Sequence, residues 1–250
     1  MPEVSNVPFE MGDNTCWRKR IGKFSDGISS FDFSATSYTS IFTSKLFPLL
    51  VYDINRIEGT LVGYNDSERE CATMLKIRSY FKENCKPPMN VAWDSEGGRE
   101  LSHPSSDNKL YHCAAAVKYL LIDNVNSPLT LDLIVTTHQI MMENSFSLDR
   151  RIPTLVGRVR TTEEVNAGMY HFVESSSVLS CMRNLVSEYN NCCRDRHAID
   201  LATFLFYEMI NIHPLNNGNG RLCRLFLAWS LMSNGFPFPV SFPSGHSKRR

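Results

Sequence analysis

A short polar linker between two apolar helical segments constrains this chain more than any other sequence feature. Residues 198–212 and roughly 220–234 both place apolar side chains at helical intervals, and the eight residues HPLNNGNG join them. Two apolar helices in succession form a buried pair, which needs no polar, glycine-rich connection for its packing. The linker therefore indicates a function as well as a turn.

The rest of the chain is also mainly helical by pattern. Further helices are expected at 110–122, 129–143 and 177–190, with shorter ones ending at Gly59 and spanning about 67–82. Residues 157–172 contain two short β-prone runs around an expected turn at 166–168, which predicts a small hairpin. The predicted fold class is all-α, a helical bundle with one β-hairpin.

The chain divides into three parts by composition. Its 250 residues, 42% of them hydrophobic, suit a single globular domain with a short accessory segment. Residues 1–45 predict a loosely ordered arm, and 46–105 predict helices followed by a surface loop at 86–108. Residues 106–250 are expected to form the main domain.

Charge and hydropathy exclude several function classes. The 26 basic and 26 acidic residues balance, which argues against nucleic-acid or anionic-membrane partners. No stretch reaches the roughly 18–20 apolar residues of a membrane helix, and no signal sequence is visible. Eight cysteines without a C-x-x-C pair suit a reducing compartment and no structural zinc site. A cytoplasmic protein is expected.

The linker and the helix after it gather groups that suit phosphate chemistry. Gly218, Asn219 and Gly220 would present backbone N–H groups at a helix start, where the helix dipole adds partial positive charge. Arg221 and Arg224 lie three residues apart on one helical face and can clamp successive phosphates.

His213, at the end of the preceding helix, can act as a general base. Each group also has a purely structural reading, as a helix end, a cap or a solvated charge. In combination they favour phosphoryl transfer.

Residues 213–224, HPLNNGNGRLCR, resemble the Fic motif H-x-F-x-D/E-G-N-G-R-x-x-R. Three other stretches agree with that family: RIEG at 56–59 resembles its inhibitory helix, CAAAVKYL at 113–120 a core helix, and GRVRTT at 157–162 the start of its target-binding flap. The resemblance implies a Fic-type helical bundle over 106–250 with an inhibitory helix in 46–105.

The resemblance also implies an activity, the transfer of AMP from ATP to a Ser, Thr or Tyr hydroxyl of a protein substrate. ATP and Mg²⁺ or Mn²⁺ would be the cofactors, and a protein substrate bound at the flap the partner. The resemblance makes His213 the catalytic base and Asn217 the metal ligand, with Gly218, Asn219 and Gly220 as the phosphate cradle. Arg221 and Arg224 would be the phosphate-binding cations, and Glu58 the inhibitory glutamate paired with Arg224. Gly168, Met169 and Tyr170 would belong to the flap.

Three positions and the C-terminus depart from the family pattern. Asn217 replaces the carboxylate that would bind Mg²⁺, so the site loses an anionic ligand and catalysis is expected to be weak. Leu215 replaces Phe and stays apolar, and Ile54 replaces the Ser or Thr expected before the inhibitory glutamate. The printed C-terminus is short for such a domain.

Three functions remain open at this stage. The first is AMP transfer restrained by Glu58, and the second is removal of AMP from a modified protein. The third is a nucleotide-binding pseudoenzyme that acts by binding a partner. The sequence names neither the protein target nor the oligomeric state, for which a homodimer is one possibility.

Overall fold

The computed structural model describes residues 45–58, 74–81, 106–142, 156–162, 164–167, 169–192 and 196–240. All of them lie within one compact unit, residues 39–250. The predicted arm up to residue 44, Gly59, the loop from 86 to 105, Gly168 and the C-terminal residues 241–250 lie outside the described residues.

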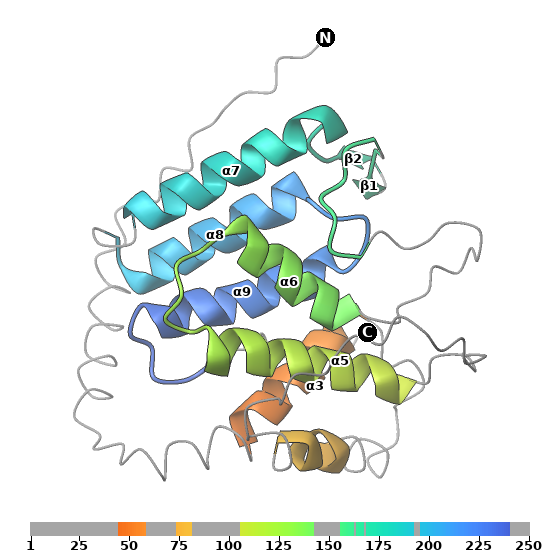
Figure 1. The fold of residues 1–250 in the computed structure, drawn as a ribbon, viewed down its shortest axis with the longest axis vertical. Helices are drawn as coiled ribbons and strands as arrows, with labels where there is room; N and C mark the ends of the chain where they lie inside the picture. The colour runs from red at the N-terminus through yellow and green to blue at the C-terminus, as the bar shows by residue number, and fades with distance from the viewer. Residues whose placement is uncertain are drawn as a thin grey trace, which may run out of the picture. The chain divides into compact units, whose positions relative to one another are not determined.

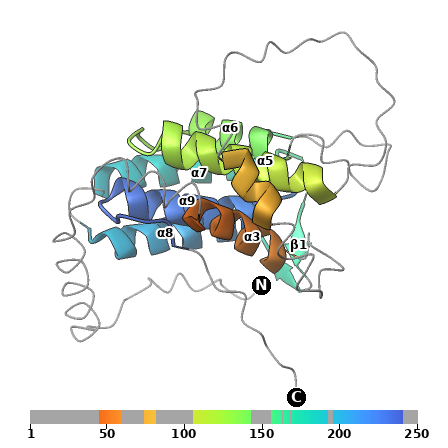
Figure 2. The same ribbon diagram turned by 90° about the horizontal axis from the view of Figure 1, so that it is seen from below.

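The two helices around the polar linker form the centre of the bundle. Helices α8 (Ala198–Ile212) and α9 (Asn219–Ser233) pack closely against each other, as Figure 1 shows. Helix α9 is apolar on nearly every face, and its residues from 222 to 231, Arg224 excepted, are all buried. Figure 2 shows α9 between α8 on one side and α5 and α6 on the other. The predicted buried pair is confirmed.

The remaining helices surround this pair. They are α3 (Phe47–Ile57), α5 (Ser106–Lys118), the π-helical turn η2 (Tyr119–Asp123), α6 (Leu131–Met142) and α7 (Ser175–Cys192), and residues 74–81 are helical as well. Helix α3 contacts both α5 and α9, so it reaches the start of the central helix from a distant part of the sequence. The predicted all-α class is confirmed.

One boundary of the predicted surface loop is wrong. Residues 106–108 were expected in the loop at 86–108 but form the first turn of α5. The Ser, Asp and Asn at these positions resemble loop residues in composition, yet they are also the types that favour helix starts. Composition alone does not separate the two.

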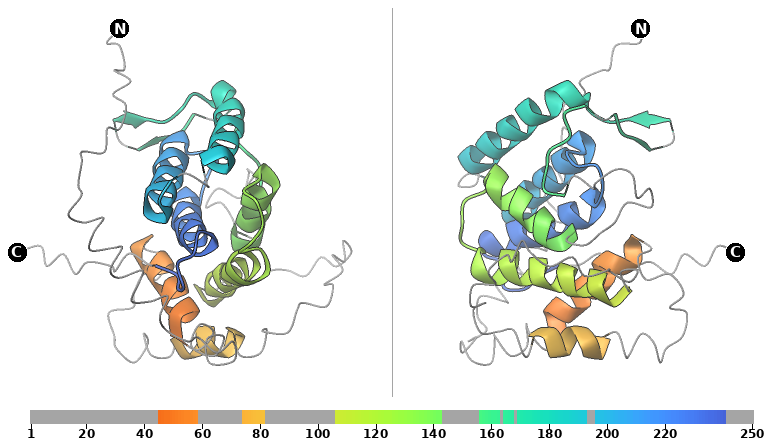
Figure 3. Two further views of the ribbon diagram at one scale, coloured as in Figure 1. Left: turned by 90° about the vertical axis from the view of Figure 1, so that its left-hand side faces the viewer. Right: turned by 45° about the vertical axis from the view of Figure 1, so that its right-hand side comes forward.

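The hairpin is present, with its turn displaced from the predicted position. Strands β1 (Asn166–Ala167) and β2 (Tyr170–His171) pair antiparallel, Asn166 opposite His171. Asn166 is therefore a strand residue, not part of the turn expected at 166–168. Its side-chain oxygen lies 2.8 Å from the His171 Nδ1, which adds a cross-strand hydrogen bond. Figure 3 shows the hairpin extending away from the helices.

None of the helices formed by the described residues is both long and apolar enough to traverse a lipid bilayer.

Candidate active site

His213 lies at the junction between α8 and the polar linker. It is the C-cap of α8 in a left-handed conformation, φ 50° and ψ 61°, and its N–H donates to the Met209 carbonyl at 3.1 Å. Residues other than glycine adopt this conformation at a cost, so surrounding contacts must hold it. The geometry turns the chain sharply where the predicted base stands.

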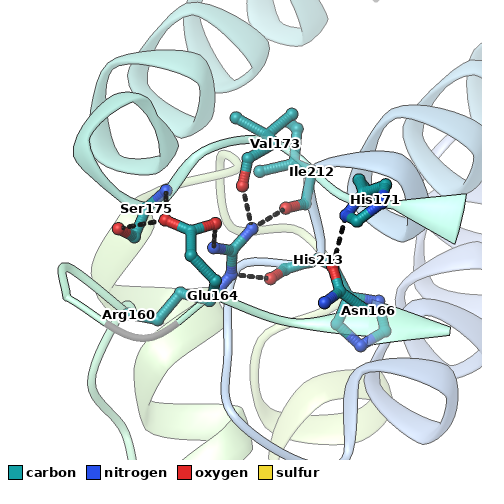
Figure 4. Close-up of polar contacts among 8 residues, drawn as sticks. All are labelled: Arg160, Glu164, Asn166, His171, Val173, Ser175, Ile212 and His213. Carbon is teal, nitrogen blue, oxygen red and sulfur yellow. Dashed lines mark hydrogen bonds and ion pairs between the residues drawn. The ribbon is translucent and has the colours of Figure 1, made fainter.

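Arg160 supplies those contacts, a role that its place in the GRVRTT stretch did not predict. Its Nε donates to the His213 carbonyl at 2.8 Å, and its Nη2 donates to the carbonyls of Ile212, at 3.1 Å, and Val173 (Figure 4). Its own N–H donates to the Pro214 carbonyl at 2.9 Å. The buried guanidinium thus ties the end of α8 to the segment after the hairpin.

The acidic partner of Arg160 belongs to the same region. Glu164 places one carboxylate oxygen 4.0 Å from the Arg160 Nη1, and its other oxygen accepts from the Ser175 N–H and hydroxyl at 3.1 and 2.7 Å. These hydrogen bonds lower the pKa of Glu164. The start of α7, the hairpin base and the α8 C-terminus therefore form one connected polar network.

The imidazole of His213 is oriented by an aromatic contact and a backbone carbonyl. Its ring stacks on Phe172 with centroids 3.9 Å apart, and its Nδ1 lies 3.4 Å from the Ile210 carbonyl. A carbonyl only accepts, so Nδ1 carries the proton in this arrangement and Nε2 keeps its lone pair. Burial lowers the pKa of His213, which leaves it neutral at pH 7 and able to accept a proton.

The linker reaches α9 through a glycine that other residues would replace poorly. Gly218 is the N-cap of α9 with φ 77°, and a Cβ there would lie 2.8 Å from the Met142 Sδ. The Asn219 side chain, 2% exposed, accepts from the Leu215 N–H at 3.0 Å and donates to the Leu215 carbonyl at 2.5 Å. The side-chain amide of Asn219 therefore holds the linker in place. Only the backbone N–H of Asn219, in the first helical turn, is left for the phosphate binding predicted from the sequence.

Arg221 is a buried cation without an anionic partner among the described residues. The residue is 5% exposed, its Nη2 lies 2.9 Å from the Met142 Sδ, and its Nη1 has no hydrogen-bond partner. An unpaired buried charge is costly, and structures tolerate it mainly where a ligand completes it. Arg221 is the strongest sign of an anion site in the described part of the chain.

Arg224 is paired, and its partner is Glu58. The Glu58 carboxylate follows the last turn of α3 and forms an ion pair with the Arg224 Nη1 across 166 positions of sequence. The same carboxylate lies against Gly220, where an added Cβ would collide with it. The contact predicted between Glu58 and Arg224 is present, and it occupies the side of the α9 start where Arg224 lies.

His138, which the sequence did not single out, supports the linker from α6. The Gly157 N–H donates to its Nδ1 at 3.0 Å, so its Nε2 carries the proton and donates to the Asn217 carbonyl at 3.0 Å. Burial lowers the pKa of His138 to about 4, which keeps the ring neutral. Its place on the buried stripe of α6, beside Thr137 and Met141, was the available sequence signal.

The predicted metal position holds a neutral amide. Asn217 is exposed, and its Oδ1 accepts from the Gly218 N–H at 2.7 Å. Among the described residues, no cluster of three His, Cys, Asp or Glu side chains could hold a metal ion. A metal at Asn217 would therefore depend on an amide oxygen and on the ligands that a bound nucleotide brings.

The two described residues of the predicted flap, Met169 and Tyr170, differ in their contacts. Met169 is 94% exposed at the hairpin tip, whereas the Tyr170 hydroxyl donates to the Asn211 Oδ1 on α8 at 2.9 Å. Tyr170 also packs edge to face on Phe172 with centroids 5.0 Å apart. The hairpin is therefore connected through Phe172 to the ring of His213.

A cavity of about 740 Å³ lies at the other end of α9. Its lining is formed by Asn126, Ser127, Pro128, Leu129, Tyr189, Asn190, Asn191, Trp229, Ser233 and Asn234. None of the predicted site residues contributes to it, so this cavity and the cationic start of α9 are separate features.

Comparison with known proteins agrees with the geometry. Residues 128–231 match the model of the Fic/DOC family, a range that includes His138, Arg160 and the whole linker. The chain is 29% identical over 140 residues to protein adenylyltransferase fic-1 of Caenorhabditis elegans, covering 54% of this chain and 26% of that protein. Residues 128–231 thus match the Fic/DOC family model, and the chain is distantly similar to protein adenylyltransferases.

Solved structures share the fold. A structure of Fic-1 from C. elegans superposes with a TM-score of 0.62 at 19% identity, covering 89% of this chain and 58% of that one. A Fic domain containing signaling protein from Bacteroides thetaiotaomicron gives 0.60 at 16% identity, covering 87% and 73%. The chain spans about a quarter of the curated relative named above.

Proposed function

We propose that this chain transfers AMP from ATP to a hydroxyl group of a protein substrate and that Glu58 restrains the reaction. The observation that carries the proposal is Arg221, a buried cation with an unsatisfied Nη1 at the start of α9. Next to it the chain supplies a neutral histidine with a free Nε2 and a second arginine. Few ligands other than a polyphosphate need all three.

The residues around the α9 start fit the phosphates of ATP. Arg221 can donate its free N–H groups to phosphate oxygens, a charged contact that also relieves its own burial. The first-turn N–H groups of α9 point in the helix-dipole direction that favours anions. No Cβ could fit at Gly218 or Gly220, where Met142 and the Glu58 carboxylate lie.

His213 suits the chemical step. Its Nε2 would take the proton of the target hydroxyl while that oxygen forms a bond to the α-phosphorus and pyrophosphate leaves. Arg160 holds the His213 carbonyl and the Phe172 ring holds the imidazole, so the base is positioned before substrate arrives. A bound Mg²⁺ would offset negative charge on the phosphates, with Asn217 as its protein ligand.

Glu58 supports restraint because it occupies the second arginine. Arg224 cannot hold a terminal phosphate while it pairs with the Glu58 carboxylate, and that carboxylate would repel the phosphate as well. The pair is partly exposed, with side-chain exposures of 20% and 29%, so it can open without unfolding the bundle. We infer that ATP with all three phosphates binds productively only when Glu58 moves.

Two observations favour other activities of the same site. The neutral Asn217, whose oxygen already accepts a hydrogen bond, favours nucleotide binding without transfer. The Glu58 carboxylate at the α9 start favours removal of AMP from a modified protein, where it would position water. Both alternatives use the Arg221 anion site and differ from AMP transfer in the chemistry at His213.

The test is self-labelling with ATP that carries radioactive phosphorus in its α-phosphate. The Glu58→Gly variant should incorporate label at least about tenfold faster than the unmodified chain, because Arg224 becomes free to hold phosphate. Adding His213→Ala to that variant should abolish labelling while ATP binding, measured by calorimetry, persists. Each reaction is run with Mg²⁺ and with Mn²⁺.

The outcomes separate the three candidates. Labelling that is unchanged by Glu58→Gly contradicts restraint by Glu58. ATP binding without His213-dependent labelling, even after Asn217→Asp, favours the nucleotide-binding protein. Release of AMP from a labelled protein by the unmodified chain, lost in Glu58→Gly, favours the reverse reaction.

A further inference from the structure

The linker contains two Asn-Gly pairs that the fold treats very differently. They are Asn217-Gly218 and Asn219-Gly220. An asparagine followed by glycine is chemically labile, because the glycine nitrogen can attack the side-chain amide carbon and no Cβ hinders it. The two pairs lie two residues apart, so differences in their reactivity come from the structure.

Asn217 is the more accessible of the two asparagines for this attack. It is exposed, and its Oδ1 lies 2.7 Å from the Gly218 nitrogen. The carbonyl carbon Cγ is one bond of about 1.2 Å from Oδ1, so it lies no more than about 4 Å from that nitrogen. This single hydrogen bond, donated by the Gly218 N–H, must open before the nitrogen can attack.

Neighbouring groups favour loss of the Gly218 amide proton. His138 donates its Nε2–H to the Asn217 carbonyl at 3.0 Å, and this carbonyl belongs to the same peptide unit as the Gly218 nitrogen. Electron density drawn onto that oxygen acidifies the N–H. The start of α9 and the unpaired Arg221 add positive potential next to the negative charge that would form.

Asn219 is an internal control supplied by the same linker. Its side chain is buried, and both its oxygen and its nitrogen are hydrogen-bonded to the backbone of Leu215, at 3.0 and 2.5 Å. It is also the first residue of α9, so its backbone is fixed in helical geometry. Attack by the Gly220 nitrogen would require breaking both hydrogen bonds.

We propose that Asn217-Gly218 is a self-modification site, at which the folded chain converts Asn217 into an acidic residue while Asn219 stays intact. The Gly218 nitrogen releases its proton to solvent and bonds to Cγ of Asn217, and ammonia leaves to give a succinimide. Water then opens the ring, giving aspartate or isoaspartate. One amide is exchanged for one carboxylate, with no oxidant or reductant.

The aspartate product would change the predicted metal ligand, residue 217. It places a carboxylate at the motif position that holds a neutral amide in the newly made chain. This consequence rests on the proposed function, because it assumes that residue 217 faces a nucleotide-bound cation. The modification itself does not depend on that assumption.

The experiment follows the folded 250-residue chain by mass spectrometry during incubation at mildly alkaline pH. Trypsin releases residues 197–221 as one peptide that carries both pairs. Fragment ions assign the mass increase to 217 or 219, and electron-transfer fragmentation separates aspartate from isoaspartate. Digestion in heavy-oxygen water marks any modification that arises during preparation. The same chain in denaturant gives the intrinsic reactivity of each pair.

The expected result is conversion at 217 that exceeds conversion at 219 by about tenfold or more in the folded chain, since net loss of one or two hydrogen bonds gives such a factor. In denaturant the two pairs should react at similar rates. Equal rates in the folded chain, or faster conversion at 219, overturn the proposal. The Asn217→Gln variant, which cannot form the five-membered ring readily, should gain no mass at 217.

A metal-binding measurement tests the consequence separately. Manganese affinity in the presence of a non-hydrolysable ATP analogue is compared for fresh chain, aged chain, Asn217→Asp and Asn217→Gln. The aged aspartate fraction should match Asn217→Asp and exceed fresh chain and Asn217→Gln by about tenfold, because a carboxylate anchors a hard dication better than an amide. Equal affinities, or isoaspartate as the sole product, remove this consequence. Nucleotide labelling by Glu58→Gly, by contrast, decides the proposed function.

Discussion

The two ends of α9 differ in the charge and the pairing of their polar side chains. At its start, Arg221 is buried with an Nη1 that has no partner among the described residues. Near its end, Ser230 and Asn234 hydrogen-bond to the hydroxyl of Tyr189 at 2.8 and 3.1 Å, and the Trp229 indole donates to the Asn124 carbonyl at 3.0 Å. The first end carries unsatisfied charge, whereas the second is a neutral network.

The cavity at the end of α9 offers little to an anion. The cavity of about 740 Å³ lies at the end of α9, and no charged side chain lines it. Tyr189, Trp229 and Asn234, which line it, hydrogen-bond within the protein, and these bonds stabilise the fold. The start of α9 has the opposite character, so its unsatisfied cation is the better indicator of a binding site.

The largest expected effect comes from removing that cation. In a Glu58→Gly background, Arg221→Met should weaken ATP binding by about 100-fold, which is roughly the 3 kcal/mol of a strong charged hydrogen bond. The free energy of unfolding should stay equal or rise, because an unpaired buried charge is replaced by an apolar side chain. Calorimetry and urea unfolding measure the two effects.

The exposed Arg183 on α7 offers a matched control. Arg183→Met should change neither ATP affinity nor stability. If Arg221→Met instead lowered the free energy of unfolding by several kcal/mol and left ATP binding unchanged, Arg221 would serve only the stability of the fold. The start of α9 would then have the same role as its end.

The second effect concerns His138, which supports the linker before α9. Burial lowers its pKa from 6.5 to about 4, so the unfolded chain binds a proton that the folded chain does not. Its contribution is therefore fully present above pH 6.5 and is lost as the pH falls toward 4. Between about pH 7 and about pH 5 we expect the free energy of unfolding to fall by about 2 kcal/mol from this group.

The His138→Gln variant checks this assignment, since its amide can keep both hydrogen bonds without titrating. Urea unfolding at the two pH values, with a chelator present, should show a drop smaller by about 2 kcal/mol in the variant. An identical drop in both chains would assign the pH dependence to other groups.

The smallest effect is expected at the neutral end. Tyr189→Phe removes the hydroxyl shared by Ser230 and Asn234 and should lower the free energy of unfolding by about 1 kcal/mol. ATP affinity should not change, because the network lies at the end of α9 away from Arg221. Tyr111→Phe, on a ring that is 40% exposed, is the matched control for loss of a tyrosine hydroxyl. Weaker ATP binding in Tyr189→Phe alone would show that the two ends are coupled.

Local pattern was sufficient for most of the helices. Apolar spacing predicted α8 at its observed bounds and α9 within one residue at each end, because each helix has a clear stop signal in sequence. The hairpin turn was misplaced, since strands of two residues carry too little periodicity to define a register. The start of α5 was missed because helix-starting and loop-forming residues overlap in type.

The site was predictable in its linker and much less so in its supports. His213, Arg221 and Arg224 were visible because they lie in one short stretch with glycines between them. Arg160 and His138 were not visible, because their roles consist of hydrogen bonds to carbonyls 53 and 79 positions away. No local pattern encodes such partners.

The amino-acid sequence by itself determined a helical bundle, a break between two buried helices, and a set of side chains at that break of the types that suit phosphate. These follow from periodicity and backbone preference, which act over a few residues. Only the tertiary structure decided that Arg221 is buried without a counterion among the described residues, that Glu58 pairs with Arg224, and that Asn217 is exposed while the Asn219 side chain is held by two hydrogen bonds. Burial and pairing depend on which distant helices meet, and that is set by the packing of the whole domain.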